Sequence, residues 1–199
     1  MTAPSVATGT PLSMTEVRDA LLALPHPFRR EDVHRVVSRL RATPAELVRY
    51  QNWSDERYTR TRFYGGERFE ILVLCWSEGQ TSPIHDHAQS ICSMLVLEGE
   101  AETTMYEVRD AGAGEGADDR QRGRGGKTLV AESATRLPAG NLTTVYGGDI
   151  HKVGNPRGSG SRLITIHFYL PPIPEMLVWD EGDPTPRACR AVTLDPHPA

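Results

Sequence analysis

Hydrophobic residues recur with two different periods along this chain, a helical period in its N-terminal part and a strand period in the remainder. Val17 and Leu21 lie on one face of a helix that begins at Ser13, where the sequence S-M-T-E has the form of a capping box. Valine and leucine keep helical spacing from about residue 29 to residue 41, and Thr43 precedes a proline at the start of a third, short helix. The N-terminal part is therefore predicted to be helical.

The remainder of the chain consists of short segments rich in β-branched and aromatic residues, separated by Gly, Pro, Ser or Asp. Segments of this kind are typical of strands joined by turns. Strands are expected at residues 58–64, 69–76, 91–97, 102–108, 142–146 and 162–170. Several short strands after a helical preface predict a mostly β fold, a sandwich or barrel with helices on one side.

The length of 199 residues suits one domain, whose parts we delimit by composition. We expect a flexible tail at 1–12, a helical segment at 13–55 packed on the barrel, the barrel itself at 56–180 and a C-terminal tail at 181–199. Within the barrel, residues 111–127 are rich in Gly, Arg and Asp and have almost nothing to bury. They are predicted to form a mobile loop.

Composition narrows the class of function. Hydrophobic residues make up 38% of the chain, enough for a core, and 22 Lys and Arg against 26 Asp and Glu give a net charge of −4. Nucleic-acid-binding proteins usually carry a basic surplus, so no nucleic acid is expected as a partner. The longest apolar run, 71–76, is far shorter than the ~20 residues that span a bilayer. No secretory signal is evident and the three cysteines are widely spaced, which predicts a cytoplasmic protein without a membrane anchor.

The last predicted strand alternates polar and apolar residues. Thr165, His167 and Tyr169 are separated by isoleucine and phenylalanine, and a period of two places these three side chains on one face. In a small barrel, a face that carries histidine and tyrosine indicates a polar cavity. The alternative is a face that points to solvent.

His85 and His87 lie one residue apart, so both imidazoles can project from one face of a strand and reach one metal ion. The spacing from Gly79 through these histidines to Gly99 resembles the first motif of the cupin superfamily. Cys92 stands where most cupins have a glutamate ligand.

A second spacing, around Tyr146, His151 and Asn155, resembles the second cupin motif, with Tyr146 in place of the usual proline. The two spacings in this order predict a metal site formed by His85, His87 and His151. Three neutral imidazoles leave the full charge on a divalent metal, which suits Fe(II) with a thiolate and dioxygen. Zn²⁺ with a bound water is an alternative that the spacing does not exclude.

Longer stretches resemble the cysteine dioxygenases, which are thiol dioxygenases of the cupin superfamily. The resemblance runs from about residue 58 to residue 180, and the helical preface is in keeping with it. Its densest parts are residues 58–60, 74–79, 84–87 with Cys92, 149–151 and 167–172. The resemblance implies a single, jelly-roll-like cupin β-barrel with an N-terminal helical segment.

The resemblance also implies a role for each candidate site residue. His85, His87 and His151 would hold Fe(II), the only cofactor expected. Arg60, with Tyr58 beside it, would bind the carboxylate of the substrate. Both groups of residues would then face the same cavity.

In the same family a cysteine–tyrosine thioether lies beside the iron, and Cys92 and Tyr169 match its two positions. Thr165, His167 and Tyr169 match a hydrogen-bonded Ser/Thr–His–Tyr set. For Cys92 the alternative of a small buried thiol that packs as a hydrophobic residue stays open. Ile91 departs from the animal members, which carry histidine there, so no role is implied for it.

The function implied is the oxidation of L-cysteine by O2 to cysteine sulfinic acid, by an iron-dependent enzyme that we expect to be a monomer. Two alternatives stay open. A sister enzyme oxidises 3-mercaptopropionate, but its members tend to carry glutamine at the position of Arg60. A non-enzymatic, metal-binding cupin would not need the polar face of Thr165, His167 and Tyr169.

Overall fold

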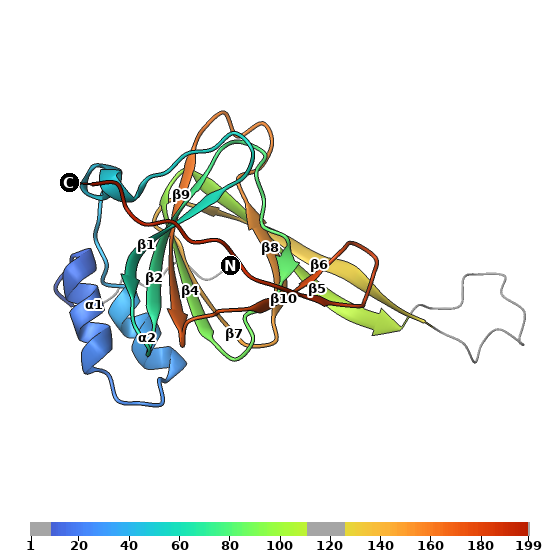
Figure 1. The fold of residues 1–199 in the computed structure, drawn as a ribbon, viewed down its shortest axis with the longest axis horizontal. Coiled ribbons are helices and arrows are strands. Elements are labelled where there is room, and N and C mark those ends of the chain that lie inside the picture. Colours follow the sequence, from blue (N-terminus) through green and yellow to red (C-terminus); the bar gives the residue numbers. More distant parts are fainter. Residues whose placement is uncertain (1–8, 111–125, 199) are drawn as a thin grey trace, which may run out of the picture.

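The computed structural model describes residues 9–110 and 126–198, which form two antiparallel β-sheets and three helices. The helices lie on the outer side of the five-stranded sheet, and the six-stranded sheet lies across the barrel from them (Figure 1). The predicted mostly β barrel with N-terminal helices is confirmed.

The helices are α1 (Met14–Ala23), α2 (Arg30–Val37) and the 3-10 helix η1 (Pro44–Tyr50). The five-stranded sheet contains, in spatial order, β1 (Thr59–Gly65), β2 (Glu70–Trp76), β9 (Leu163–Leu170), β4 (Ile91–Glu98) and β7 (Leu142–Tyr146). The six-stranded sheet contains β11 (Arg187–Cys189), β10 (Met176–Trp179), β3 (Ile84–His85), β8 (Ile150–Gly154), β5 (Glu100–Asp110) and β6 (Lys127–Pro138). Neighbouring strands run antiparallel throughout.

Side-chain caps explain where two of the helices begin. The Ser13 hydroxyl accepts a hydrogen bond from the backbone N–H of Glu16, and the Glu16 carboxylate accepts one from the backbone N–H of Ser13. Thr43 and Glu46 form the same reciprocal pair before η1. Both caps satisfy backbone donors that the first helical turn leaves free.

The ends of the helices differ from the sequence expectation. α2 ends at Val37, and not near residue 41, because the chain turns there and Leu40 pairs with Leu12 in an isolated parallel bridge. The third helix is of the 3-10 type. Within the described part of the chain, no helix combines the length and the hydrophobicity that crossing a membrane requires.

Two apolar layers lie on the two sides of the five-stranded sheet. On its outer face, side chains such as Val73 and Ile166 pack against Val17 of α1 and Val33 of α2. On its inner face, Leu72 and its neighbours on β2 belong to a second cluster in the barrel interior. β2 and β9 are therefore buried on both faces, and side chains that alternate along them belong to different layers.

Five strands are absent from the sequence prediction: β3, β6, β8, β10 and β11. β3 and β11 are too short to show a period. β6 pairs along the whole length of β5 but has mostly exposed side chains, so it gives little hydrophobic signal. The mobile loop predicted at 111–127 lies outside the described residues, except for residue 126 and Lys127, which begins β6.

The segments predicted as tails also make contacts. Residues 1–8 lie outside the described part of the chain. After β11, the C-terminal segment runs back to β1 (Figure 1), where the Leu194 N–H donates to the Arg60 carbonyl at 2.7 Å. The Arg62 N–H in turn donates to the Leu194 carbonyl at 2.9 Å. This segment thus lies along the outer edge of β1.

Candidate active site

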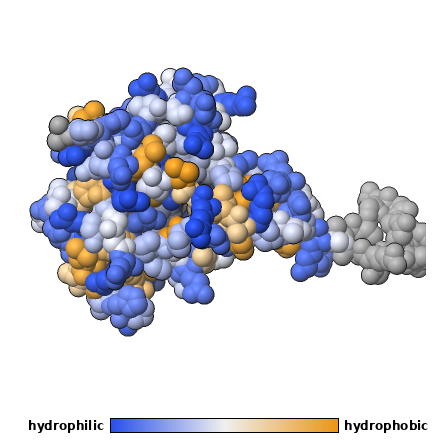
Figure 2. All heavy atoms as spheres, in the orientation of Figure 1, coloured by the Kyte–Doolittle hydropathy of each residue, from blue (hydrophilic) through white to orange (hydrophobic). Residues whose placement is uncertain are grey.

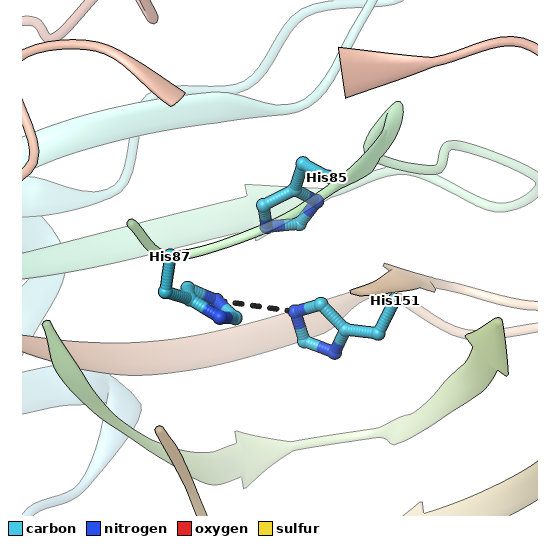
Figure 3. A group of neighbouring side chains, drawn as sticks. All are labelled: His85, His87 and His151. Carbon is cyan, nitrogen blue, oxygen red and sulfur yellow. Dashed lines mark hydrogen bonds between the residues drawn. The ribbon is translucent and has the colours of Figure 1, made fainter. Parts of the chain in front are cut away.

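Three histidine side chains converge inside the barrel (Figure 3). His85 in β3 and His151 in β8 lie directly opposite each other across the two strands, and His87 follows β3. Their potential ligand nitrogens all lie within 4.8 Å of one another, and Nε2 of His87 is 3.2 Å from Nε2 of His151. Two nitrogens bound at about 2.1 Å to one ion, at a right angle, are about 3 Å apart, so this spacing fits a shared metal ion. Among residues 9–110 and 126–198 this is the one such cluster.

Hydrogen-bond partners lie behind the rings of two of the three histidines, His85 and His151. Nδ1 of His85 donates to the carbonyl oxygen of Pro83 at 2.9 Å, so its Nε2 keeps a free lone pair. Nδ1 of His151 lies 3.4 Å from Oγ1 of Thr103. Nδ1 of the buried His87 has no hydrogen-bond partner within the described structure. Histidines that bind metals are usually oriented by such groups behind the ring.

The three imidazoles are neutral near pH 7. Burial lowers the pKa of His85 to about 4 and the pKa of His87 to about 2, and it lowers the pKa of His151 as well. A charge on a neighbouring histidine would lower the pKa values of His87 and His151 further. Neutral imidazole is the form that binds a metal, so this donor set fits a divalent transition-metal ion.

Tyr169 lies near one of the three histidines, and Cys92 is its partner on the neighbouring strand. They pair across β4 and β9, both side chains are buried, and the Tyr169 ring is 6.2 Å from the ring of His87 between centroids. Burial raises the pKa of the Cys92 thiol to about 12, against the opposing charge of Arg60. Cys92 therefore presents a protonated thiol beside a phenol.

The inner face of β9 carries a row of polar side chains. Thr165, His167 and Tyr169 are 0%, 5% and 4% exposed, so the alternative of a face that points to solvent is excluded. Oγ1 of Thr165 lies 2.9 Å from Nε2 of His167, and Nδ1 of His167 lies 3.1 Å from the Tyr169 hydroxyl. Burial lowers the pKa of His167 and raises the pKa of Tyr169, so both side chains are neutral near pH 7.

Arg60 brings a positive charge into the same interior. It lies on β1, is 6% exposed, and its guanidinium carbon is 5.6 Å from the centre of the Tyr169 ring. Among the described residues, its Nε has no hydrogen-bond partner and no aspartate or glutamate forms an ion pair with it. A buried cation without an ion-pair partner is costly, so this position is suited to an anionic ligand.

Tyr58 and Trp76 form an aromatic pair next to Arg60. Their rings are stacked, with centroids 4.2 Å apart and an angle of 14° between planes. Burial raises the pKa of Tyr58, while the charge of Arg60 opposes the rise. The indole N–H of Trp76 donates to Oγ1 of Thr165 at 2.9 Å. The sequence pattern does not single out Trp76, because β2 is hydrophobic at almost every position. Only the register of β2 against β9 shows that Trp76 lies close to Thr165.

This chain is similar in sequence to known proteins along most of its length. The model of a family described as cysteine dioxygenase type I matches residues 27–182, a range that includes every candidate site residue. The proteins named cysteine dioxygenase type 1 of Rattus norvegicus and Homo sapiens are each 26% identical over 153 residues, 76% of this chain and 70% of theirs. A solved structure of an uncharacterized protein with a double-stranded β-helix domain from Klebsiella pneumoniae has a TM-score of 0.47 and 18% identity, over 68% of this chain and 95% of that chain.

Proposed function

The chain belongs to the cysteine dioxygenase type I family and is a thiol dioxygenase, and we propose that it oxidises L-cysteine to cysteine sulfinic acid. In this reaction R–SH and O2 give R–SO2H, with both oxygen atoms bound to sulfur. The sulfur loses the electrons that dioxygen gains, and the thiol proton ends on the sulfinic acid. No organic cofactor and no further reductant are required.

The substrate assignment depends on one observation, the buried guanidinium of Arg60 without an anionic partner among the described residues. The carboxylate of cysteine supplies the missing charge and can form two parallel hydrogen bonds with the guanidinium. Tyr58 and Trp76, whose rings are stacked, would shield that pair from water. A carboxylate held there has its direction fixed relative to the three histidines.

We assign Fe(II) to His85, His87 and His151. Three neutral nitrogen donors that converge from β3, β8 and the segment after β3 support this assignment. When bound, Fe(II) supplies the redox chemistry that lets dioxygen react with a thiolate. The protein part of the site contributes no negative charge to the metal, because Cys92 is protonated and stands where most cupins have a glutamate.

Tyr169 is assigned the role of hydrogen-bond donor to the oxygen atoms that are transferred to sulfur. Its hydroxyl is buried and held by His167 at 3.1 Å, so it needs little reorganisation during the reaction. A fixed donor stabilises negative charge that develops on oxygen in a site from which water is excluded. The Thr165 hydroxyl holds His167 from the other side.

We further propose that a thioether forms between Sγ of Cys92 and the Tyr169 ring carbon next to the hydroxyl. The pairing of the two residues across β4 and β9 supports it, because side chains directly opposite on antiparallel strands have Cβ atoms roughly 5 Å apart. The S–H and ring C–H bonds break, one C–S bond forms, and the two hydrogens with their electrons pass to dioxygen, the oxidant of the main reaction.

We propose that the protein is cytoplasmic and monomeric. Cys75, Cys92 and Cys189 are free thiols, in keeping with a reducing compartment. Every proposed site residue lies within this one chain, in keeping with a monomer.

Oxygen uptake by the iron-loaded protein tests the proposed function. We expect one O2 to be consumed per L-cysteine, with cysteine sulfinic acid as the product by mass spectrometry, and a slower reaction with 3-mercaptopropionate. Faster turnover of 3-mercaptopropionate would assign the chain to the sister activity. No uptake with either thiol would leave a non-enzymatic metal-binding protein.

A further inference from the structure

The hydrogen-bonded row on β9 extends onto the neighbouring strand β2. Nε1 of Trp76 donates to Oγ1 of Thr165 at 2.9 Å, and the row continues through His167 to Tyr169. Trp76 is 1% exposed and Thr165 is fully buried, so water does not replace these bonds. The row therefore begins with an indole and ends with a phenol.

The indole gives this row a direction, because the N–H of tryptophan can only donate. Oγ1 of Thr165 accepts from Trp76, and its one other side-chain partner within the described residues is Nε2 of His167. The Thr165 proton has an acceptor only if it points to Nε2 of His167. The reverse arrangement, with His167 donating to Thr165, leaves a buried hydroxyl proton unpaired, which is disfavoured.

The direction continues along the row. Because Nε2 accepts, the neutral His167 carries its proton on Nδ1 and donates it to the hydroxyl oxygen of Tyr169. The Tyr169 O–H is then left to donate to another group. We propose that Trp76 is a positioning residue that fixes the direction of this row, so that the Tyr169 hydroxyl donates toward the barrel interior and not to His167.

The effect of Trp76 on the reaction rests on the proposed function. The direction of the hydrogen bonds does not, and it can be measured separately. Trp76 also stacks on Tyr58, so an alanine variant would disturb both contacts. Trp76→Phe removes the N–H donor and keeps a smaller aromatic ring against Tyr58, so its loss of ring volume has to be matched by a control. Trp179→Phe is the matched control, because Trp179 is also buried and its indole N–H donates to the Pro184 carbonyl, outside the row.

The experiment is nitrogen-15 NMR of histidine-labelled protein loaded with Zn²⁺ in place of iron, with the His167 signals assigned from His167→Gln. We expect the wild type and Trp179→Phe to carry the His167 proton on Nδ1, and Trp76→Phe to show both tautomers in comparable amounts. Thr165→Ser, which keeps a hydroxyl, is expected to behave as the wild type. A wild-type proton on Nε2 would overturn the proposal without any variant, and an unchanged tautomer in folded Trp76→Phe would overturn it too.

Activity supplies the second readout. In the iron-loaded Trp76→Phe protein, kcat is expected to fall at least about twofold. The Tyr169 hydroxyl would then have two comparable orientations and would donate to the reacting oxygen atoms only about half of the time. Iron content and the KM for cysteine are expected to stay near the wild-type values. A loss of kcat without a change of tautomer would indicate a structural role and overturn the proposal. Absence of O2 uptake in the wild type itself would instead refute the proposed function and leave the NMR result standing.

Discussion

Cys92 and Tyr169 face each other across β4 and β9, both are buried, and the Tyr169 ring lies 6.2 Å from that of His87. We predict that protein aged under turnover with cysteine and O2 loses about 2 Da, the mass of two hydrogens, and migrates as a doublet on a denaturing gel. Mass spectrometry of the peptide that joins the two residues identifies the bond.

Two cysteine variants make that prediction specific. Cys92→Ser should abolish the second band and keep part of the activity, because the Tyr169 hydroxyl remains. Cys75→Ser should keep the doublet, since Cys75 lies on the outer face of the same sheet, in the layer that contacts the helices. A doublet that survives in Cys92→Ser would leave Cys92 as a structural thiol.

Replacing His85 by alanine is expected to remove most of the iron and nearly all O2 uptake, because two remaining imidazoles compete poorly with buffer and water for Fe(II). The matched control is His34→Ala, an exposed histidine of α2 that contacts Thr144 and not the cluster. Metal analysis and oxygen uptake check both variants. Stoichiometric zinc in the wild type, with activity that iron chelators leave unaffected, would contradict the iron assignment.

Arg60→Gln is expected to lower kcat/KM for cysteine by about 30-fold or more, the equivalent of roughly 2–5 kcal/mol for a truncated buried ion pair. Iron content should change little, because Arg60 is not a ligand. Steady-state kinetics on both thiols measure the effect. Arg62→Gln is the control on the same strand: Arg62 is exposed, and its ion pair among the described residues is with an exposed Asp195 at 3.4 Å. Equal losses in the two variants would remove the argument for a carboxylate site at Arg60.

His167 is expected to make folding stability depend on pH. Its pKa is lowered in the folded protein by burial and by the charge of Arg60, so below about pH 6.5 the unfolded chain takes up a proton that the folded chain does not. The free energy of unfolding should therefore decrease as the pH falls below that value, by at most about 1.4 kcal/mol per pH unit for this one proton.

Urea denaturation of iron-free wild type and His167→Gln between pH 5 and pH 8.5 measures this contribution. The wild type should lose stability more steeply than the variant between pH 6.5 and 5. Above pH 7.5, where the histidine is neutral in both states, the two curves should run parallel. Parallel curves over the whole range would show that His167 takes up its proton equally in both states.

The sequence predicts those parts of the site whose residues lie close together on one strand. Thr165, His167 and Tyr169 share a face because they alternate on one strand, and the structure places them on one inner face. His85 and His151 are distant in sequence, and their proximity follows only from the pairing of β3 with β8. A resemblance of motifs, and not periodicity, brings them together in the prediction.

The features that the hydrophobic pattern does not predict were missed for physical reasons. β2 is buried on both faces, so its hydrophobic run carries no information about which residues point into the barrel interior, and Trp76 gives no signal. β6 presents most of its side chains to solvent and is held by backbone pairing with β5. β3 is two residues long, and the strands on each side of it position it.

The place of β9 between β2 and β4 has a consequence for how this protein is made. β9 is synthesised long after both of its neighbours, yet it is hydrogen-bonded to each of them along its length. A nascent chain or fragment that ends before residue 163 has β2 and β4 without the strand that joins them, and each then has an unpaired hydrophobic edge. Such edges pair readily with other chains, so premature termination or slow translation after β8 is expected to yield aggregates.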